Sequence, residues 1–269
     1  MTIDFKPVSD ILGVEVIGYD PDAAADETTA EAIREAFARH HLLLFRGREF
    51  SEEQQIALCR LVGVISSRGG KGYAKANRLA SFVSNVHDDG IFREGELSFH
   101  SDLTFMEHPL KGRSLHALVL PSEGGDTLFA NVELAYEKLP QDLRERIAGK
   151  SARHAITYEK NGQTFVDEFV RPMIDRHPES GRPVLMVSRA VTKEILGMER
   201  PEFRALLKEI WAHIDQPQFV YRHKWRMHDL ILWDNISLQH ARTHFDPAEK
   251  RALRAVSVDS EAVARQTAA

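Results

Sequence analysis

Cysteine, long apolar runs and a basic amino terminus are scarce or missing in this sequence, and each absence excludes a class of protein. The 269 residues include one cysteine, Cys59, which cannot form an internal disulfide and suits a reducing cytoplasm. No apolar run approaches the roughly 18 residues of a membrane-spanning helix. Residues 1–6 lack the basic start and the apolar block of a signal peptide. We therefore expect a cytoplasmic protein without a membrane partner.

An excess of positive charge is missing as well. The net charge is −5, which gives no reason to expect a nucleic-acid partner. A glycine-bearing loop over residues 62–77 carries Arg68 and Lys71, but it lacks the Gly-Lys-Ser/Thr ending of a phosphate-binding loop. These exclusions leave a small molecule as the expected partner, and they leave assembly into a homo-oligomer open.

The pattern of apolar residues predicts a mainly β protein. Many short strands with few helices favour a barrel or sandwich with helices packed outside, because a parallel α/β sheet would need regular strand–helix alternation. We expect a single domain over residues 1–269, since no linker or internal repeat divides the chain. A long polar stretch over residues 160–182 is typical of a loop or lid.

The expected elements follow from periodicity and from capping signals. Two capping boxes, Thr28 to Glu31 and Ser51 to Gln54, each predict the start of a helix. The expected helices cover residues 28–40, 51–61, 132–139, 141–147 and 201–214. The expected strands cover residues 13–18, 42–45, 79–86, 97–105, 115–120, 126–129, 153–158, 184–187, 219–225, 229–233 and 252–258.

The strand expected at residues 97–105 contains a pair of possible metal ligands. His100 and Asp102 are two residues apart, so on a strand both side chains leave the same face. An imidazole beside a carboxylate supplies two of the three ligands in the 2-His-1-carboxylate triad of non-heme Fe(II) oxygenases. The spacing alone does not identify a metal site, because His-x-Asp begins at four positions: His87, His100, His213 and His244. Only His100 lies in an apolar-flanked strand pattern.

A third ligand must come from another part of the chain, and His240 is the candidate. It follows a buried strand pattern, a turn at Asp234-Asn235 and a second strand pattern. A histidine in this setting is more often a hydrogen-bonded core residue than a ligand. His228 and His244 are rivals on sequence grounds.

Two side chains downstream of Asp102 have the chemistry to bind a carboxylate. Arg251 lies 11 residues after His240, and its planar fork can bind a carboxylate bidentately. Arg254 is the alternative, but on one strand the two arginines face opposite sides, so only one enters a barrel. Thr127 lies 25 residues after Asp102, and its hydroxyl can assist the same carboxylate.

Taken in order, these residues resemble the taurine dioxygenase family of Fe(II)/2-oxoglutarate-dependent oxygenases. The resemblance extends over essentially the whole chain. The matching stretches are Phe45-Arg46 with residues 51–54, Phe99 to Phe105, Gly124 to Leu128, His177 to Gly181, Trp233 to Asn235 with Gln239-His240, and Lys250-Arg251.

The resemblance implies a double-stranded β-helix (jelly-roll) core with flanking α-helices. It implies that His100, Asp102 and His240 bind Fe(II). It also implies that Thr127 and Arg251 bind the distal carboxylate of 2-oxoglutarate, which favours Arg251 over Arg254. With O2 as the oxidant, the expected outcome is hydroxylation of a small, anionic organic substrate with release of succinate and CO2.

The sequence departs from the taurine enzyme where the substrate is held. The taurine enzyme has a second, sulfonate-binding arginine four residues after its co-substrate arginine, and this position is Ala255 here. Taurine is therefore not the expected substrate. Arg68 and Lys71 are candidates to bind a substrate carboxylate, sulfate or phosphate instead. A solvated basic loop is the simpler interpretation of the same two residues.

Two other classes of function use the same His-Asp-His set. A zinc-dependent hydrolase on a jelly-roll fold would use it to activate water, but it would need no Arg251–Thr127 pair. A non-enzymatic metal-binding jelly-roll protein would need neither the pair nor a site open to a substrate.

Overall fold

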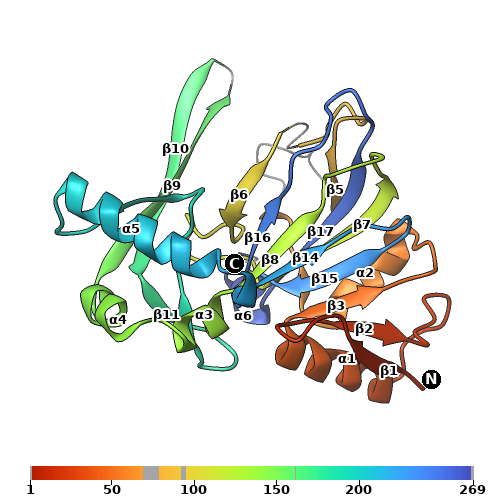
Figure 1. Ribbon diagram of the computed structural model, residues 1–269. Coiled ribbons are helices and arrows are strands. Elements are labelled where there is room, and N and C mark those ends of the chain that lie inside the picture. Colours follow the sequence, from red (N-terminus) through yellow and green to blue (C-terminus); the bar gives the residue numbers. More distant parts are fainter. Residues whose placement is uncertain (1, 69–78, 92–94, 161, 268–269) are drawn as a thin grey trace.

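Two β-sheets form the centre of the fold (Figure 1). The computed structural model describes residues 2–68, 79–91, 95–160 and 162–267. The larger sheet is ordered β1 (Asp4–Pro7), β2 (Val14–Ile17), β3 (Leu42–Phe45), β15 (Leu230–Asp234), β7 (Gly112–Val119), β17 (Ala252–Asp259) and β4 (Val64–Ile65), with β5 (Ala80–Ser84) also paired to β17. The smaller sheet is ordered β14 (Val220–His223), β8 (Thr127–Asn131), β16 (Leu238–Arg242) and β6 (Leu97–His100).

The remaining strands and the helices pack around these two sheets. The additional strands are β9 (Ser151–Lys160), β10 (Gln163–Pro172), β11 (Ile174–Arg176), β12 (Pro183–Leu185) and β13 (Thr192–Ile195). The helices are α1 (Glu27–His40), α2 (Glu52–Arg60), α3 (Val132–Glu137), α4 (Gln141–Ile147), α5 (Arg200–Ile214) and α6 (Glu261–Thr267), with a 3₁₀ turn, η2, at Pro217–Phe219. This is the mainly β jelly-roll with flanking helices that the sequence predicted.

The two sheets face each other across an apolar core. Leu115, Trp233 and Leu253 of the larger sheet pack in one cluster with Phe129 and Leu238 of the smaller sheet. The rings of Phe129 and Trp233 meet edge to face, with centroids 5.3 Å apart. Burial of these side chains between the layers is what holds the sheets together.

Strand alternation gives the larger sheet a second buried face. On β17, Leu253 and Ala255 point into the core between the sheets, whereas Val256 and Val258 point outward. The outward side chains pack against α1 and α2, and Cys59 of α2 is fully buried among them. Burial raises the pKa of the Cys59 thiol to about 12, so this cysteine is an inert part of the core.

The capping signals predicted one helix start correctly and one incorrectly. Ser51 caps α2 through the predicted box, because its hydroxyl accepts from the backbone N–H of Gln54 and the Gln54 side chain accepts from the N–H of Ser51. The prediction that Thr28 starts a helix through a capping box is wrong. Asp26 caps α1 by accepting from the N–H of Thr29 at 2.8 Å, and an aspartate two residues upstream therefore starts the helix earlier.

The stretch expected to be a loop over residues 160–182 is mostly β structure. Strands β9 and β10 form a long antiparallel hairpin that stands out from the body of the molecule (Figure 1). Thr164, Phe165 and Val166 of β10 have the β-branched and aromatic side chains that favour strands, and Tyr158 stacks on Phe165 across the pair. The charged and polar residues of the stretch 160–182 suggested a loop. They occur in a strand pair here because both faces of the outer hairpin are solvated.

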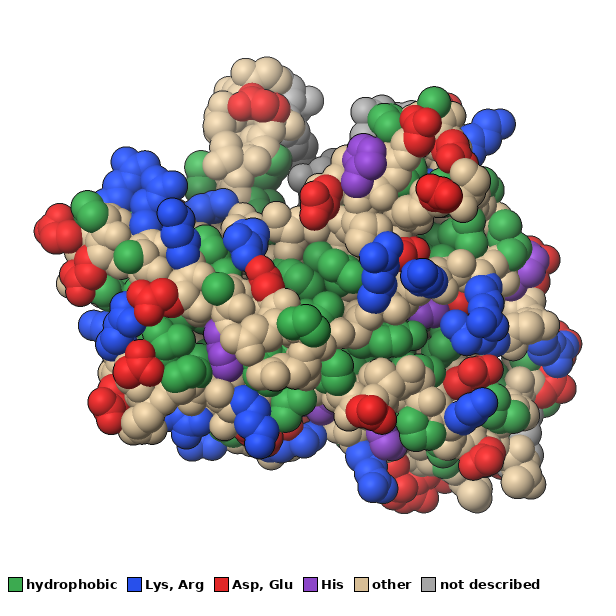
Figure 2. Space-filling view, viewed as in Figure 1, with side chains coloured by type: hydrophobic (Ala, Val, Ile, Leu, Met, Phe, Trp, Pro, Cys, Tyr) green, Lys and Arg blue, Asp and Glu red, His purple; other side chains and the backbone are tan. Residues whose placement is uncertain are grey.

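The surface has no single dominant charge on the face that Figure 2 shows, where acidic and basic side chains are interspersed. Within the described ranges, none of the helices combines the length and the apolar character needed to cross a membrane.

A buried aspartate at the end of β15 is hydrogen-bonded to the turn that follows this strand and to a distant histidine. Asp234, at the end of β15, accepts from the N–H of Ile236 at 2.8 Å, from the hydroxyl of Ser237 at 3.0 Å and from Nε2 of His177 at 2.9 Å. Nδ1 of His177 accepts in turn from the N–H groups of Glu179 and Ser180, which leaves Nε2 as the donor to Asp234. Burial alone would raise the pKa of Asp234, but the hydrogen bonds and charge of His177 and His41 outweigh burial and hold that pKa far below its usual range.

The first prediction concerns this aspartate. A lowered carboxyl pKa stabilises the folded state above the unfolded pKa of about 3.9, and the stabilisation is lost as the pH falls toward the folded pKa. Asp234→Asn should lower the free energy of unfolding by about 1.5–3 kcal/mol at pH 7, and by progressively less below pH ~4. Denaturant titrations across this pH range measure both effects. The exposed Asp142→Asn serves as the control and should change stability little at any pH; an Asp234→Asn deficit that is constant with pH would contradict the assignment.

Candidate metal centre and adjoining cavities

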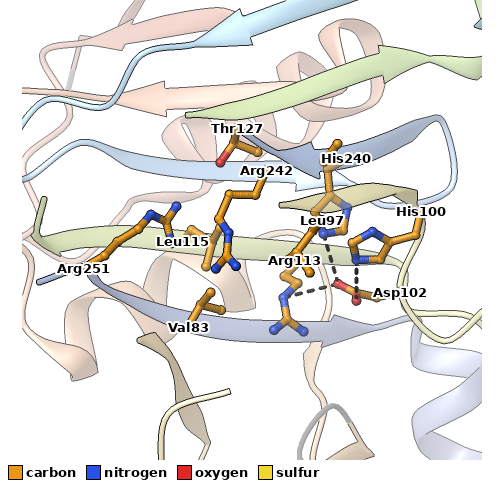
Figure 3. Close-up of a pocket in the computed structure, with 11 residues that line it drawn as sticks. Val83, Leu97, His100, Asp102, Arg113, Leu115, Thr127, His240, Arg242 and Arg251 are labelled. Carbon is orange, nitrogen blue, oxygen red and sulfur yellow. Dashed lines mark ion pairs between the residues drawn. The ribbon is translucent and has the colours of Figure 1, made fainter. Parts of the chain in front are cut away.

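The register of two paired strands brings the candidate metal ligands together. Strand β6 ends at His100, and β16 pairs with it so that His240 lies directly opposite His100. The two imidazole rings have centroids 4.2 Å apart and are tilted by 43°. Both side chains point toward Asp102 (Figure 3).

Asp102 reaches this point from a turn and not from the strand. The expectation of one strand over residues 97–105 is wrong beyond His100, because the chain turns after Ser101 and Leu103 has a left-handed backbone with φ of 59°. Asn235, fully buried, fixes this turn: its Oδ1 accepts from the N–H of Asp102 at 2.7 Å, and its Nδ2 donates to the Asp102 carbonyl at 3.0 Å. The side chains of His100 and Asp102 therefore converge by a turn instead of by strand alternation.

The three side chains have the spacing of a metal site. Nε2 of His100 lies 3.8 Å from Oδ1 of Asp102, and Nε2 of His240 lies 3.8 Å from Oδ2. The potential ligand atoms of all three lie within 4.8 Å of one another. Nδ1 of His100 is 2.8 Å from the carbonyl oxygen of Ser98, a contact that orients the ring with Nε2 toward Asp102.

The electrostatics of the three groups also suit a cation. Burial and the neighbouring His100 lower the pKa of His240 to about 3, so this imidazole is neutral and able to bind a metal at neutral pH. Burial would raise the pKa of Asp102, but Arg113, His240 and His100 outweigh it and lower that pKa, so Asp102 is a carboxylate. Oδ2 of Asp102 is buried and has no hydrogen-bond partner among the described residues.

Arg251 and Thr127 line one cavity with these three residues. The cavity is small, about 30 Å³, and Figure 3 shows Arg251 at the end opposite to the histidines. Arg251 is 2% exposed; its Nε and Nη2 donate to the carbonyl of Gly125 at 3.2 and 2.8 Å, while its Nη1 is buried with no hydrogen-bond partner in the described ranges. Burial and the nearby Arg242 lower the pKa of Arg251 to about 9, which still leaves it charged at neutral pH. The hydroxyl oxygen of Thr127 accepts from Nε1 of Trp225 at 3.0 Å.

Arg254 lies on the opposite face of β17, as the three-residue spacing predicted. Its guanidinium donates to the side chain of Gln55 at 2.8 Å and to the carbonyl of Phe50, on the side covered by α2. Of the two arginines, Arg251 alone faces the cavity with His240.

The other His-x-Asp sequences lie outside this site. His87 stacks on Phe82, with ring centroids 3.8 Å apart, and His213 is 2.8 Å from the carbonyl of Ala135. His244 is exposed. These three histidines line neither of the two cavities beside the metal centre.

The structure does not bring Arg68 to the candidate metal centre. Its guanidinium pairs with both carboxylate oxygens of Asp259 and donates to the carbonyl of His108 at 2.6 Å. It lines neither cavity beside the metal centre, so the expectation that Arg68 binds the substrate gains no support from this geometry. Lys71 lies outside the described residues.

A second cavity of about 270 Å³ adjoins the first, and sequence reasoning missed it together with Arg113. The two cavities share Leu97, His100, Asp102 and Arg113. We call the larger one the apolar chamber, because its further walls are mainly apolar: Ile91, Leu103, Phe105, Ile156, Ala190 and Val191. The sequence did contain a signal for Arg113. It lies two and four residues before the buried Leu115 and Ala117, so on a strand all three side chains share one face.

Comparison with known proteins gives a consistent result over the whole chain. A family model described as "Taurine catabolism dioxygenase TauD, TfdA family" matches residues 4–257. The chain is 30% identical to the alpha-ketoglutarate-dependent 2,4-dichlorophenoxyacetate dioxygenase of Cupriavidus pinatubonensis, over 98% of this chain and 100% of that protein. It is 28% identical to the alpha-ketoglutarate-dependent sulfate ester dioxygenase of Pseudomonas putida, over 97% and 91%. The crystal structure of a taurine dioxygenase from Burkholderia xenovorans matches with a TM-score of 0.82 at 28% identity, over 96% and 91%.

The second prediction concerns the packing around Arg251. Gly125 has a φ of +65°, and a Cβ there would lie 2.8 Å from Nε of Arg251. Gly149 has a similar φ of +68°, but a Cβ there would meet nothing within 4 Å. Gly125→Ala should therefore lower the free energy of unfolding by about 1–3 kcal/mol more than Gly149→Ala, because only the first adds a clash to the backbone strain. Equal losses in denaturant titrations would show that Arg251 moves aside freely.

Proposed function

The chain belongs to the TauD/TfdA family and is an Fe(II)/2-oxoglutarate-dependent dioxygenase, and from that premise we propose which of its residues perform each part of the reaction. The enzyme acts on a small molecule, with Fe(II), 2-oxoglutarate and O2 as cofactor and co-substrates. A zinc-dependent hydrolase and a non-enzymatic binding protein are not favoured, because the relatives are alpha-ketoglutarate-dependent dioxygenases.

His100, Asp102 and His240 hold the iron. The observation that supports this assignment is the convergence of two imidazoles and one carboxylate within 4.8 Å, a donor set that suits Fe(II). The imidazole of His240 is neutral and the carboxylate is ionised, and Asn235 keeps the Asp102 turn in place. With iron and 2-oxoglutarate bound, the centre supplies the oxidising power to hydroxylate a substrate with O2, as 2-oxoglutarate is converted to succinate and CO2.

Arg251 and Thr127 hold the distal carboxylate of 2-oxoglutarate. Arg251 offers a buried, charged guanidinium whose Nη1 has no partner among the described residues, and a carboxylate would satisfy it. Because Oγ1 of Thr127 already accepts from Trp225, the hydroxyl proton remains for the carboxylate.

The substrate is a small organic anion. The relatives named for 2,4-dichlorophenoxyacetate and for sulfate esters support this choice, since both names describe anionic compounds. We also propose that residues 1–269 form one domain that works in the cytoplasm without a nucleic-acid or membrane partner. The family match over residues 4–257 and the single, buried cysteine support the domain and the compartment.

The third prediction tests the iron ligands. Each of His100→Ala, Asp102→Ala and His240→Ala removes one ligand and should abolish or nearly abolish turnover and weaken Fe(II) binding. Anaerobic addition of Fe(II) and 2-oxoglutarate to the wild-type protein should produce a weak visible charge-transfer band, which these variants lose. His87→Ala and His244→Ala should retain both the band and 2-oxoglutarate-dependent succinate formation. Normal iron binding by His240→Ala would refute its assignment as the third ligand.

The fourth prediction tests the co-substrate residues. Removing a buried arginine opposite a carboxylate costs about 2–5 kcal/mol, or some 30-fold to several-thousand-fold in affinity. Arg251→Ala should therefore raise the 2-oxoglutarate concentration needed for half-maximal charge-transfer absorbance by that order, while Arg254→Ala, on the other face of β17, should change it far less. If Arg254→Ala raised this concentration more than Arg251→Ala did, the assignment of Arg251 to the co-substrate would be wrong.

A further inference from the structure

The apolar chamber has one cationic side chain in its wall. Among the described residues that line it, Arg113 is the only lysine or arginine and Asp102 is the only aspartate or glutamate. Arg113 is 5% exposed and comes from β7, on the face that looks into the barrel. Its position between the chamber and the co-substrate cavity places a positive charge beside the metal centre (Figure 3).

Arg113 is held in place but not saturated with hydrogen bonds. Its Nε lies 3.3 Å from Oδ2 of Asp102, and its Nη1 donates to the hydroxyl of Ser257 at 3.1 Å. Its Nη2 has no hydrogen-bond partner in the part of the chain that the structure describes. A guanidinium has five N–H donors, so at least part of this one is available to a ligand in the chamber.

We propose that Arg113 binds the anionic group of the primary substrate, a carboxylate, sulfate or sulfonate, while the apolar remainder of the substrate fills the chamber. This inference rests on the proposed function, in which Asp102 binds the iron. A metal ion on Asp102 would share the charge of that carboxylate and leave the Arg113 guanidinium less neutralised. The substrate anion then replaces the pairing that Arg113 has with Asp102 in the structure.

The strand register explains why this position is suited to the role. Arg113 pairs with Ser257 on β17, and the next inward pair on the same two strands is Leu115 with Ala255. Ala255 is small and buried, so its side chain leaves space beside it. A cation at 113 is therefore one strand away and diagonal to that position, within reach of the same space for a long side chain.

The geometry also limits which part of the substrate reacts. Because Nε of Arg113 is 3.3 Å from a carboxylate oxygen of a proposed iron ligand, an anion bound to this guanidinium lies close to the metal. The carbon presented for hydroxylation is therefore one near the anionic group, and the far end of the molecule points toward Ile156 and Val191.

The test is an anaerobic titration of protein loaded with Fe(II) and 2-oxoglutarate. The probes are phenoxyacetate and hexyl sulfate, with the neutral phenoxyacetamide as the matched control compound, and binding is followed by the change in the visible charge-transfer band. The variants are Arg113→Gln and Arg113→Lys. Arg189→Gln is the control, because Arg189 adjoins the chamber residue Ala190 but its guanidinium pairs with Asp215.

We expect at least one anionic probe to bind the wild-type protein and phenoxyacetamide to bind much more weakly. Arg113→Gln should weaken binding of that probe by about 10- to 100-fold, the range for a charged hydrogen bond, and should shift the 2-oxoglutarate titration far less. Arg113→Lys should recover part of the affinity, and Arg189→Gln should match the wild type.

Three results would overturn the inference. Equal binding of the anionic probes to wild type and Arg113→Gln, or failure of both to bind wild type, would show that Arg113 does not bind the substrate anion. Equal binding of phenoxyacetamide would show that charge is not recognised. Loss of the 2-oxoglutarate band itself in folded Arg113→Gln and Arg113→Lys would show that Arg113 serves Asp102 or the co-substrate. A wild-type protein that forms no band at all would instead refute the proposed function.

Discussion

The pairing of β6 with β16 is the constraint on which the candidate centre depends. It sets His240 opposite His100, although the two residues are 140 positions apart in the chain. Because side chains alternate along a strand, a slip of one residue in this register would turn one imidazole to the other side of the sheet. The buried core between the sheets opposes such a slip, since Leu238 would lose its place beside Phe129. The apolar packing of the jelly-roll and the geometry of the polar centre are thus fixed by one register.

The same alternation separates the polar groups of the larger sheet into two sets. Arg251, just before β17, and Arg113 of β7 face the cavities between the sheets, whereas Arg254 and His116 face outward toward α2 and Phe50. Arg254 donates to Gln55 and to the carbonyl of Phe50, both within the protein. Inward residues retain unused donors, such as Nη1 of Arg251. The difference between Arg254 and the two inward arginines is therefore visible in what they face, a helix or a cavity, and not in their burial, which is similar.

Much of this arrangement follows from the sequence, and the exceptions have physical causes. The three-residue spacing of Arg251 and Arg254 correctly predicted that they face opposite ways, because a strand has a fixed period. The His100–Asp102 spacing predicted convergence for the wrong reason, since the turn at Leu103 depends on the distant Asn235 and no local pattern reveals that contact. Arg68 looked available because its partner, Asp259, is 191 residues away. The β9–β10 hairpin was hidden by its charged residues, which a solvated strand accommodates as readily as a loop.

Because of the β9–β10 hairpin, the residues that line the apolar chamber come partly from a different structural element than the residues of the metal centre. The three residues proposed to bind iron and Arg251 come from the barrel, but Ile156, which lines the chamber, comes from β9, whose outer end lies in solvent. Changes in the hairpin can therefore reshape the chamber without disturbing the register that assembles the metal centre. Substrate preference can therefore change through substitutions in the hairpin, while the residues of the metal centre and their chemistry stay the same.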